Sequence, residues 1–540
     1  MKVPKILYPI IDVVATHLRP LAMMYVVLPL SFILRNVLAI HAFVYNTFLA
    51  SPQLHQSRVD RVSACVKRRF ELPPEKQKPM CTARAAWMNL STRFATYKES
   101  SERIYVADLC DIISLDEKNM IVRAEPLVEV GTMTRWLQKR GYMLAVNLEI
   151  EEATLGGLAM AVGMSTYSHI SGLYQENVVA YEVVLADGTF VRATRDNEYK
   201  DLWHALPWSH GSLALLVCLE LKVIPTKPYV HVKYTPFHDQ KKYCDYITEI
   251  SLAKDPPDFV EASVFSEESA VVMEGRFVDI TYDPLKWLQI NHVGLWYKQW
   301  FWMHVKGFLS KSGPVNEYVP TLEYVFRHNR GIFWALRDQM GMIGNNVFFR
   351  YFFGWLSPPK VTFLKLPATP EIRVEMMCQR VYQDIVLPLR TLPEAINKAS
   401  KLFGCWPILV YPSRVYDHGE GNRGIFPSPP KEDLVPGENY GMFYDLGVYG
   451  IPHAVRKKLP YKAVTNMREM EDYTSSVGGG PFLYADTFMS KEEFGKMFNL
   501  DLYDKVRVKY GAVGHFPELY DKIKPEIDYM AILDQENKTY

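Results

Sequence analysis

Hydrophobic positions are unevenly distributed along the chain, and the first fifty residues differ from all that follow. Residues 21–50 carry a single formal charge, Arg35. A run of about 20 apolar residues is long enough to cross a bilayer, whereas a signal peptide has a shorter apolar run and a small-residue cleavage site. We therefore predict an N-terminal membrane anchor over residues 1–55. It either spans the membrane with Arg35 near one interface or lies in one leaflet as a bent hairpin.

Basic residues are more numerous after this anchor than before it. They are Lys2, Lys5 and Arg19 on the first side, and Arg58, Arg61, Lys67, Arg68 and Arg69 on the second. By the positive-inside tendency, the large C-terminal part faces the cytosol. Seven cysteines are scattered singly, without a CxxC pair, which suits reduced thiols in that compartment.

Behind a short charged link, short strands alternate with short helices. Residues 121–131 read as strand and residues 132–141 as a helix. Asp187-Gly188 joins two β-rich runs and is the strongest short hairpin signal in the chain. This pattern predicts an α+β domain over residues 56–228.

The remainder predicts a second α+β domain over residues 229–480 and a helical segment over residues 481–540 that closes on the first domain. SKEE at residues 490–493 is a capping box that opens a helix. Six of the eleven tryptophans lie between Trp287 and Trp355. Such aromatic density needs either a large core or a large apolar ligand, and we predict core packing for most of these rings.

Charge and motifs exclude several classes of function. The net charge of +1 at pH 7 is nearly neutral for 540 residues, which argues against a nucleic-acid partner. The sequence has no Walker motif, no GxSxG elbow, no HExxH and no spacing typical of a metal site. One GxGxxG lies at residues 419–424, but IFPSPP follows it. A dinucleotide fingerprint needs a helix at that point, so we predict a loop.

The segment TLGGLAMAVG at residues 154–163 places two adjacent glycines, and then a third, among apolar residues. Glycine inside a regular element costs about 0.5–1 kcal/mol relative to alanine, so such a run marks a turn or a close approach by another group. That group is either protein backbone or a ligand phosphate held by bare N–H groups. Taken alone, the ten residues favour packing against protein.

Five segments occur in a fixed order around this turn. They are AEPLVEVGT, TLGGLAMAVG, STYSHISGL, the Asp187-Gly188 hairpin and DLWHALPWSHGSLALLVCLEL. Together they resemble the FAD-binding domain of the vanillyl-alcohol-oxidase type of flavoprotein. Four further segments narrow the resemblance to the delta-24-sterol reductase family. They are AYEVVLADGTFVR, IFWALRD, FRYFFGWLSPPK and LYADTFMSKEEF. The resemblance extends from the anchor to about Ile523.

The resemblance implies a two-part FAD-binding domain followed by an α+β substrate domain. It implies that the glycine turn, the SHxxGL segment and the GSL segment contact FAD. The residues assigned to the cofactor in this way are Thr154, Leu155, Gly156, Gly157, Leu158, Ala159, Met160, Ala161, Val162, Gly163, Met164, Ser165, Thr166, Ser168, His169, Gly172, Gly211 and Leu213. For His169, direct flavin contact and a hydrogen-bonded role in holding its loop remain open alternatives.

The resemblance also implies an activity. In this activity NADPH reduces FAD, and reduced FAD then reduces the side-chain double bond of a 24-dehydrosterol. The resemblance also implies a protein of the endoplasmic reticulum membrane. Some relatives attach FAD covalently through a histidine in an earlier turn, but residues 81–87 contain none, so FAD is expected to be non-covalent. No separate NADPH fold is evident, and NADPH is expected to use the same flavin face.

That earlier turn departs from the family pattern. CTARAAW at residues 81–87 has alanines, Ala83 and Ala86, where the family has glycines. Alanine disfavours positive φ. FAD affinity is therefore expected to fall if these positions need positive φ, and to be unchanged if their backbone is ordinary.

Reduction of an unpolarised alkene is easiest when the less substituted carbon is protonated and hydride reaches the more substituted one. The site therefore needs an acid in a dry apolar cleft. The candidates are Tyr484, Asp486 and Tyr444, together with Asp445 and Tyr411. Each also has a purely structural interpretation. Two other functions stay open, a flavin oxidase acting on a polar alcohol or lactone and a non-catalytic sterol-binding membrane protein.

Overall fold

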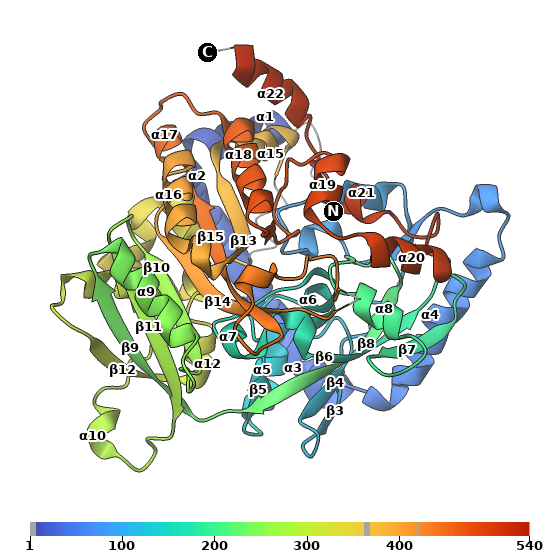
Figure 1. The fold of residues 1–540 in the computed structure, drawn as a ribbon, viewed down its shortest axis with the longest axis horizontal. Coiled ribbons are helices and arrows are strands. Elements are labelled where there is room, and N and C mark those ends of the chain that lie inside the picture. The colour runs from blue at the N-terminus through green and yellow to red at the C-terminus, as the bar shows by residue number, and fades with distance from the viewer. Residues whose placement is uncertain (1–6, 361–364, 366–367, 420–421, 539–540) are drawn as a thin grey trace.

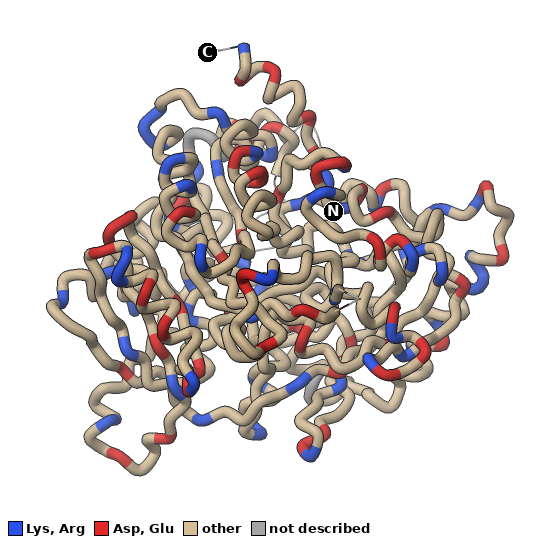
Figure 2. Tube along the Cα trace, in the orientation of Figure 1, with Lys and Arg blue, Asp and Glu red and all other residues tan. Residues whose placement is uncertain are grey.

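Two β-sheets organise the chain and lie side by side in Figure 1, surrounded by helices. The computed structural model describes residues 7–360, 365, 368–419 and 422–538. Its mixture of helices and mainly antiparallel strands is the α+β class that the sequence predicts. Acidic and basic residues are interspersed along the trace in Figure 2, in keeping with the nearly neutral net charge.

The first sheet has six strands, in the order β3-β4-β8-β6-β7 with β5 paired to β8. Their bounds are β3 Ile112–Asp116, β4 Ile121–Ala124, β5 Tyr142–Leu144, β6 Val178–Val184, β7 Phe190–Thr194 and β8 Leu215–Pro225. The predicted hairpin is confirmed, since β6 and β7 pair antiparallel around Gly188 with its φ of +85°. The strand predicted over residues 121–131 ends at Ala124, because Val130 already begins a helix.

The second sheet has eight strands, in the order β12-β9-β11-β10-β14-β15-β13-β16. Their bounds are β9 Tyr229–Phe237, β10 Phe259–Val264, β11 Ala270–Val278, β12 Val315–Pro320, β13 Val381–Pro388, β14 Ile408–Tyr416, β15 Tyr440–Gly450 and β16 Gly480–Pro481. Helices α9 (Gln240–Ser251), α16 (Leu392–Leu402) and α18 (Ala463–Ser476) cover one face and share a hydrophobic core with it. The opposite face contributes side chains such as Val232, Leu409 and Phe443 to a second core, which also includes residues of the first sheet.

Short helices and a two-stranded parallel pair complete the fold. The pair is β1 Met80–Thr82 and β2 Glu102–Ile104. The helices near the first sheet are α5 Val130–Gln138, α6 Leu155–Ala161, α7 Ser168–Ser171, α8 Lys200–Ala205, α19 Lys491–Met497, α20 Asp501–Lys509 and α21 Leu519–Ile523. Those near the second sheet or at the chain end are α10 Pro284–Trp287, α11 Phe301–Gly307, α12 Thr321–Val325, α13 Ala335–Met340, α14 Val347–Phe353, α15 Pro370–Gln379, α17 His453–Arg456 and α22 Tyr529–Lys538. The predicted capping box at residues 490–493 opens α19.

The charged link of the sequence forms a helix, α4 (His55–Phe70). Val59, Val62 and Val66 recur at helical spacing and pack against Val184 and Val217 of the first sheet. The charges of the segment conceal this apolar stripe when the sequence is read alone. Helix α4 therefore joins the apolar N-terminal helix to the first sheet.

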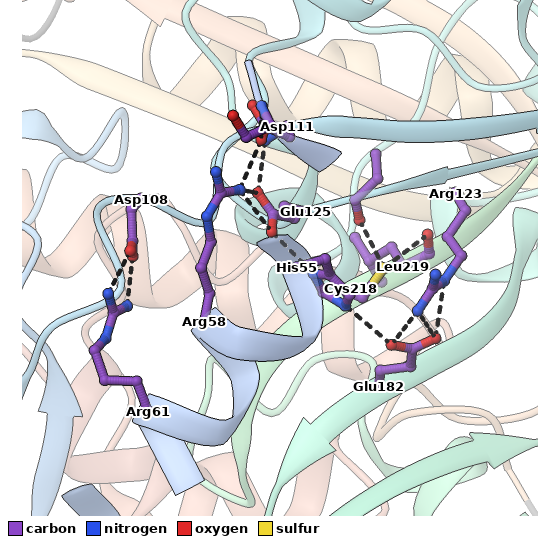
Figure 3. Close-up of polar contacts among 12 residues, drawn as sticks. His55, Arg58, Arg61, Asp108, Asp111, Arg123, Glu125, Glu182, Cys218 and Leu219 are labelled. Carbon is purple, nitrogen blue, oxygen red and sulfur yellow. Dashed lines mark hydrogen bonds and ion pairs between the residues drawn. The ribbon is translucent and has the colours of Figure 1, made fainter. Parts of the chain in front are cut away.

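A buried ionic cluster fixes the start of α4 (Figure 3). Nδ1 of His55 lies 2.8 Å from Glu125 and Nε2 lies 3.4 Å from Glu182. Arg58 Nη1 lies 2.7 Å from Asp111 and 2.9 Å from Glu125. Buried charges of this kind are stable only when each has a partner.

The protonation state of His55 determines whether the charges of this cluster are balanced. Burial by itself lowers its pKa, but hydrogen bonds with Cys218, Glu125 and Glu182 together raise the pKa to about 11. At neutral pH the histidine is therefore a cation. It neutralises carboxylates that would otherwise lie buried without enough positive charge.

A long N-terminal helix precedes α4 and contains the predicted membrane anchor. It comprises α2 Arg19–Ala22, a π-turn at Met23–Val27, α3 Leu28–Val44 and a second π-turn at Tyr45–Leu49, after the separate helix α1 Tyr8–His17. The stretch Arg19–Val44 has a mean hydropathy of 1.9 and is long and apolar enough to cross a membrane. One such helix is compatible with a membrane anchor.

The tryptophan-rich region only partly follows the prediction of core packing. Trp300, Trp302 and Trp334 are buried, but Trp355 is 44% exposed, and Trp287 and Trp296 are exposed to a similar extent. Four of the five rings of α14 are also exposed, and only Phe349 is buried, so core packing is wrong for most of this segment. Residues 420 and 421 of the GxGxxG lie outside the described residues.

Candidate functional site

A cavity of about 910 Å³ lies between the two sheets. Its wall draws on the N-terminal helix, the first sheet, the second sheet and the C-terminal segment. Ligand pockets in proteins have volumes of about 300–1,000 Å³ and are lined mainly by apolar groups with a few polar ones. The cavity therefore has the size and position of a binding site.

Of the two adjacent glycines in the glycine turn, one packs against protein backbone and the other faces the cavity. A Cβ on Gly156 would lie 2.5 Å from the Cβ of Pro126, and its N–H donates to the Pro126 carbonyl at 2.8 Å. Gly156 is therefore needed for packing against protein. Gly157 is exposed and lines the cavity, so its bare backbone is available to a ligand.

Val162 ends this turn in an unusual conformation. Its φ is +78° and its ψ is 167°, a region that is populated almost only by glycine. A β-branched residue is a marked outlier there. Val162 and Gly163 both line the cavity, so the strained backbone lies at the candidate site.

Ten of the eighteen residues assigned to FAD line the cavity. They are Thr154, Gly156, Gly157, Leu158, Met160, Ala161, Val162, Gly163, Met164 and Gly211. The other eight do not contribute to its wall, and they are Leu155, Ala159, Ser165, Thr166, Ser168, His169, Gly172 and Leu213. For α6 the reason is helical geometry, because Leu155 and Ala159 lie four residues apart on the face that is buried in the core.

His169 does not contribute to the cavity wall and is hydrogen-bonded within the protein. The side chain is buried, and Nε2 lies 2.8 Å from the carbonyl of Pro257. Burial lowers the pKa of His169 to about 4, so the ring is neutral. Ser168 is also buried, and its Oγ accepts the N–H of Ser165 at 3.0 Å. Both side chains hold the loop beside the glycine turn.

Amines that no sequence motif indicated converge on the cavity wall. Lys98 donates to the carbonyl of Arg84 at 2.7 Å, Lys365 to that of Asn89 at 2.8 Å, and Lys522 to that of His210. In the described part of the chain these three amines donate to backbone carbonyls, and Lys98 also donates to the hydroxyl of Thr82. Only the fold brings residues so far apart in sequence together.

Burial without a paired anion perturbs these amines. It lowers the pKa of Lys365 and of Lys522 to about 7, and that of Lys98 to about 8. Nε and Nη2 of Arg93, which also lines the cavity, are buried without a hydrogen-bond partner. A diphosphate would supply the missing acceptors and negative charge. The donors of this wall therefore fit the diphosphate of FAD.

The alanines of the CTARAAW turn do not strain the backbone. Neither Ala83 nor Ala86 has a positive φ, and Ala86 opens a 3₁₀ turn. Ala85 has a φ of −61°, which is ordinary for any residue. The loss of glycine at residues 83 and 86 therefore carries no conformational cost here.

A pair of buried carboxyl groups faces the cavity from the second sheet. Asp384 on β13 and Asp445 on β15 are diagonal neighbours on one face, since Asp384 pairs with Gly447 and β-strand side chains alternate. The hydroxyl of Tyr484 donates to Asp384 Oδ2 at 2.5 Å, and that of Tyr449 donates to Oδ1. This arrangement is a carboxyl dyad held by two tyrosines.

The two carboxyl groups have different environments. Burial and the nearby charge of Asp384 raise the pKa of Asp445 well above its usual range. Burial also raises the pKa of Asp384, but the hydroxyls of Tyr449 and Tyr484 oppose that effect. Asp445 therefore holds the proton of the pair, and its Oδ1 has no hydrogen-bond partner. A neutral carboxyl facing an apolar cavity is suited to act as an acid.

Of the predicted acids, Tyr484, Asp445 and Tyr411 line the cavity, and Tyr444 and Asp486 do not. Tyr444 points to the other face of β15, where its hydroxyl lies 3.3 Å from Thr391 Oγ1. The alternation of side chains along a strand requires this, since Asp445 faces the cavity. Sequence reasoning missed Asp384, for which the chain carries no local signal.

His55, Glu182 and Cys218 could by distance hold a metal ion, because one ligand atom of each lies within 4.8 Å of the others. However, Arg123 donates to both oxygens of Glu182 at 2.7 and 2.8 Å. Both ring nitrogens of His55 also face carboxylates. These contacts make the group part of the ionic cluster in Figure 3.

Known proteins resemble the chain over most of its length. A family model described as an FAD binding domain matches residues 71–194. The chain is 37% identical over 514 residues to a Delta(24)-sterol reductase of Homo sapiens, with 95% of each chain covered. It is 32% identical over 524 residues to a Delta(24)-sterol reductase homolog of Caenorhabditis elegans, covering 95% and 96% of the two chains.

A plant relative extends the similarity across kingdoms. The chain is 35% identical over 532 residues to a Delta(24)-sterol reductase of Pisum sativum, covering 94% of this chain and 91% of the relative. The match to the FAD binding domain includes the glycine turn at residues 154–163. The chain belongs to the Delta(24)-sterol reductase family of FAD-binding proteins.

Proposed function

We propose that this chain catalyses the FAD-dependent reduction of the side-chain double bond of 24-dehydrosterols. The observation that carries the proposal is a single cavity with an anion-binding wall and a buried neutral carboxyl group. The names of the relatives support the sterol substrate. The apolar part of the wall, which includes Met23, Val27 and Leu336, suits the hydrocarbon body of a sterol.

We propose that the backbone at Gly157 and Gly211 and the amines of Lys98, Lys365 and Lys522 hold FAD. The amines contribute positive charge close to the diphosphate, and the glycines let it approach the main chain. The cofactor is non-covalent, because the turn at residues 81–87 carries no histidine. Once bound and reduced by the electron donor, FAD would supply the hydride for the reaction.

Asp445 is the proposed proton donor. Its carboxyl group transfers a proton to the less substituted carbon of the alkene while the more substituted carbon accepts hydride, so that no free carbocation forms. The product is an alkane, and Asp445 is left as a carboxylate that regains a proton from solvent. Tyr449 and Tyr484 position Asp384 beside it. The apolar wall excludes water, which strengthens these interactions.

We further infer that NADPH is the electron donor and reaches the same flavin face before the sterol does. Two substrates would then use one site in turn, in line with a cavity whose wall carries both the amines and the carboxyl groups. We place the chain at the endoplasmic reticulum membrane with its catalytic part in the cytosol. The apolar N-terminal helix and the seven free cysteines support this location.

An anaerobic titration tests the function. Purified full-length protein reconstituted with FAD is mixed with NADPH, and bleaching of the flavin absorbance is followed. Desmosterol is then added, and reoxidation of the flavin with formation of the saturated sterol is expected. Absence of bleaching would overturn the NADPH assignment, and bleaching without reoxidation would overturn the sterol assignment.

The same measurement separates the alternatives. A flavin oxidase would reduce oxygen to peroxide in the presence of a polar alcohol or lactone and would not reduce the sterol. A sterol-binding protein without catalytic activity would stay colourless after incubation with FAD. Initial rates at varied NADPH and desmosterol should give parallel double-reciprocal lines, because the two substrates alternate at one site.

A further inference from the structure

The long N-terminal helix is attached to the folded body at both ends. At its start, Nη2 of Arg19 lies 2.9 Å from Glu375 on α15. At its end, Arg58 Nη2 donates to the hydroxyl of Tyr45 at 3.4 Å, and the N–H of Ser51 donates to Asp111 at 3.1 Å. A helix of 26 residues is about 39 Å long. Both ends of this length therefore contact the same globular body.

The middle of the helix is attached as well. Arg35 donates to the carbonyls of Pro358 at 3.0 Å and Trp355 at 3.3 Å. The ring centroids of Phe32 and Trp355 lie 4.9 Å apart, and Ser31 Oγ accepts the N–H of Lys360 at 2.5 Å. A helix bound along its whole length cannot cross a bilayer while the body remains in water, because unsheltered loops and charges would have to enter the hydrocarbon.

One stripe of this helix remains uncovered and apolar. Its residues, at spacings of three and four, are Val26, Leu30, Ile33, Val37, Ile40 and Val44. All six are exposed, and Ile40 reaches 64%. This spacing keeps them on one face of an α-helix. An apolar face of such length on a soluble surface marks an interaction site.

A second exposed apolar face adjoins the first. On α14 and the turn after it, Phe348, Tyr351, Phe352 and Trp355 are all exposed, with Phe348 at 75%. We call these four residues the aromatic patch. Arg35 and Phe32 contact Trp355, so the patch and the helix lie side by side. Aromatic rings are typical of the interface between lipid headgroups and hydrocarbon.

We propose that the protein is monotopic, with residues 19–49 lying in the plane of one phospholipid leaflet and the aromatic patch inserted beside them. This arrangement keeps Arg35 hydrogen-bonded to protein carbonyls at the membrane surface rather than in the hydrocarbon. Amphipathic helices bind membranes in this way by burying their apolar face at the acyl boundary.

The cavity provides an independent reason for a lipid partner. Met23, Val26 and Val27 of the same helix line its wall. Val26 also belongs to the exposed stripe, so one helix separates the cavity from the proposed leaflet. This step rests on the proposed function, since a sterol substrate dissolves in the leaflet and would enter beside the helix. A water-soluble substrate would gain nothing from this geometry.

Fluorescence on vesicles tests the insertion without reference to activity. Full-length V37C, F352C and V508C variants are labelled with an environment-sensitive dye and mixed with phosphatidylcholine–phosphatidylserine vesicles. Val508 on α20 is the matched control, as its exposure of 73% is close to the 66% of Phe352. Wild-type protein treated in the same way corrects for the native cysteines. We expect emission at residues 37 and 352 to rise severalfold and emission at residue 508 to stay unchanged.

Two results would overturn the proposal. A response at residue 37 without one at residue 352 would leave the helix as a separate anchor. A response at residue 508 equal to that at 352 would indicate nonspecific adsorption.

In sealed microsomes, protease must also remove epitope tags from both ends of the chain, because a spanning helix would protect one of them. Flavin bleaching by NADPH is measured in detergent on the same samples, so loss of the reductase function would be recognised separately.

Discussion

Asp445 and Tyr444 are neighbours in the chain, but they face opposite sides of β15. We predict that Asp445→Asn lowers the rate of sterol reduction about 10²- to 10⁴-fold, the usual contribution of a general acid. Bleaching of the flavin by NADPH should persist, because it needs no proton from Asp445. Tyr444→Phe is the control and should change the rate less than twofold. Rapid-mixing absorbance measurements follow both steps, and an unchanged reoxidation rate in Asp445→Asn would exclude this carboxyl as the donor.

Val162 allows a test of backbone strain at the candidate site. In an ordinary position, glycine is about 0.5–1 kcal/mol less stabilising than alanine. At the φ of +78° adopted by Val162 this order should reverse, because alanine keeps a Cβ in a region that glycine occupies freely. Val162→Gly should therefore unfold at a higher denaturant concentration than Val162→Ala. The same order as in ordinary helices would show that the strain is absent.

At the scale of elements, α6 illustrates what one sequence can and cannot specify. The glycines of α6 indicated a close approach by another group. The sequence did not indicate which glycine packs against protein and which faces the cavity. We predict that Gly156→Ala destabilises the fold, because a Cβ there would lie 2.9 Å from the Pro126 carbonyl. Gly157→Ala should leave the thermal unfolding midpoint within about 2 °C and weaken FAD binding. Calorimetry and flavin fluorescence measure the two effects, and equal destabilisation by both variants would contradict the distinction.

Helix α4 supports a prediction about pH. The pKa of His55 is about 11 in the folded state against 6.5 for the ordinary group, so its charge stabilises the fold most below about pH 6.5. This contribution declines as the pH rises towards 11, because folding then holds a proton that the unfolded chain has lost. His55→Gln should cost about 3–5 kcal/mol at pH 6, and the difference from wild type should shrink at pH 10. Arg61→Gln, which breaks an exposed pair with Asp108, should cost less than about 1 kcal/mol at either pH.

Local signals were reliable where a few adjacent residues determine the structure. The Asp187-Gly188 hairpin and the capping box at residues 490–493 are of this kind. Helix α4 was missed because its apolar stripe is narrow and its charges are paired by residues more than fifty positions away. The exposed aromatic patch was misjudged as core, since the sequence alone does not distinguish an exposed ring from one packed against protein.

At the scale of the whole molecule, the cavity is a product of long-range contacts. Lys98, Lys365 and Lys522 meet at its wall although more than 400 residues separate the first from the last. The resemblance to a known family indicated FAD, but no local pattern indicated these amines or Asp384. A charge cluster assembled from distant segments leaves no periodic or spacing signal in the chain.

These lysines give a prediction about cofactor affinity. The pKa of Lys365 and of Lys522 is about 7 without an anion, so both lose charge as the pH rises from 6 to 8. FAD should therefore bind about tenfold more weakly at pH 8 than at pH 6, which corresponds to about 1.4 kcal/mol. Isothermal titration calorimetry of the apoprotein measures this slope. The Lys365→Met/Lys522→Met double variant should bind FAD weakly at both pH values. If its affinity still depended on pH as in the wild type, other groups would be responsible for the effect.

The unpaired amines around the cavity have a consequence for the life of the protein in a cell. Without an anion, Lys98 and Lys522 repel each other in a buried wall. A ligand that binds only the folded chain stabilises it, and the stabilisation grows with the logarithm of the ligand concentration. Newly made chains should mature slowly and be degraded readily when the vitamin precursor of FAD is scarce. We therefore expect riboflavin starvation to lower the abundance of this protein before transcription changes.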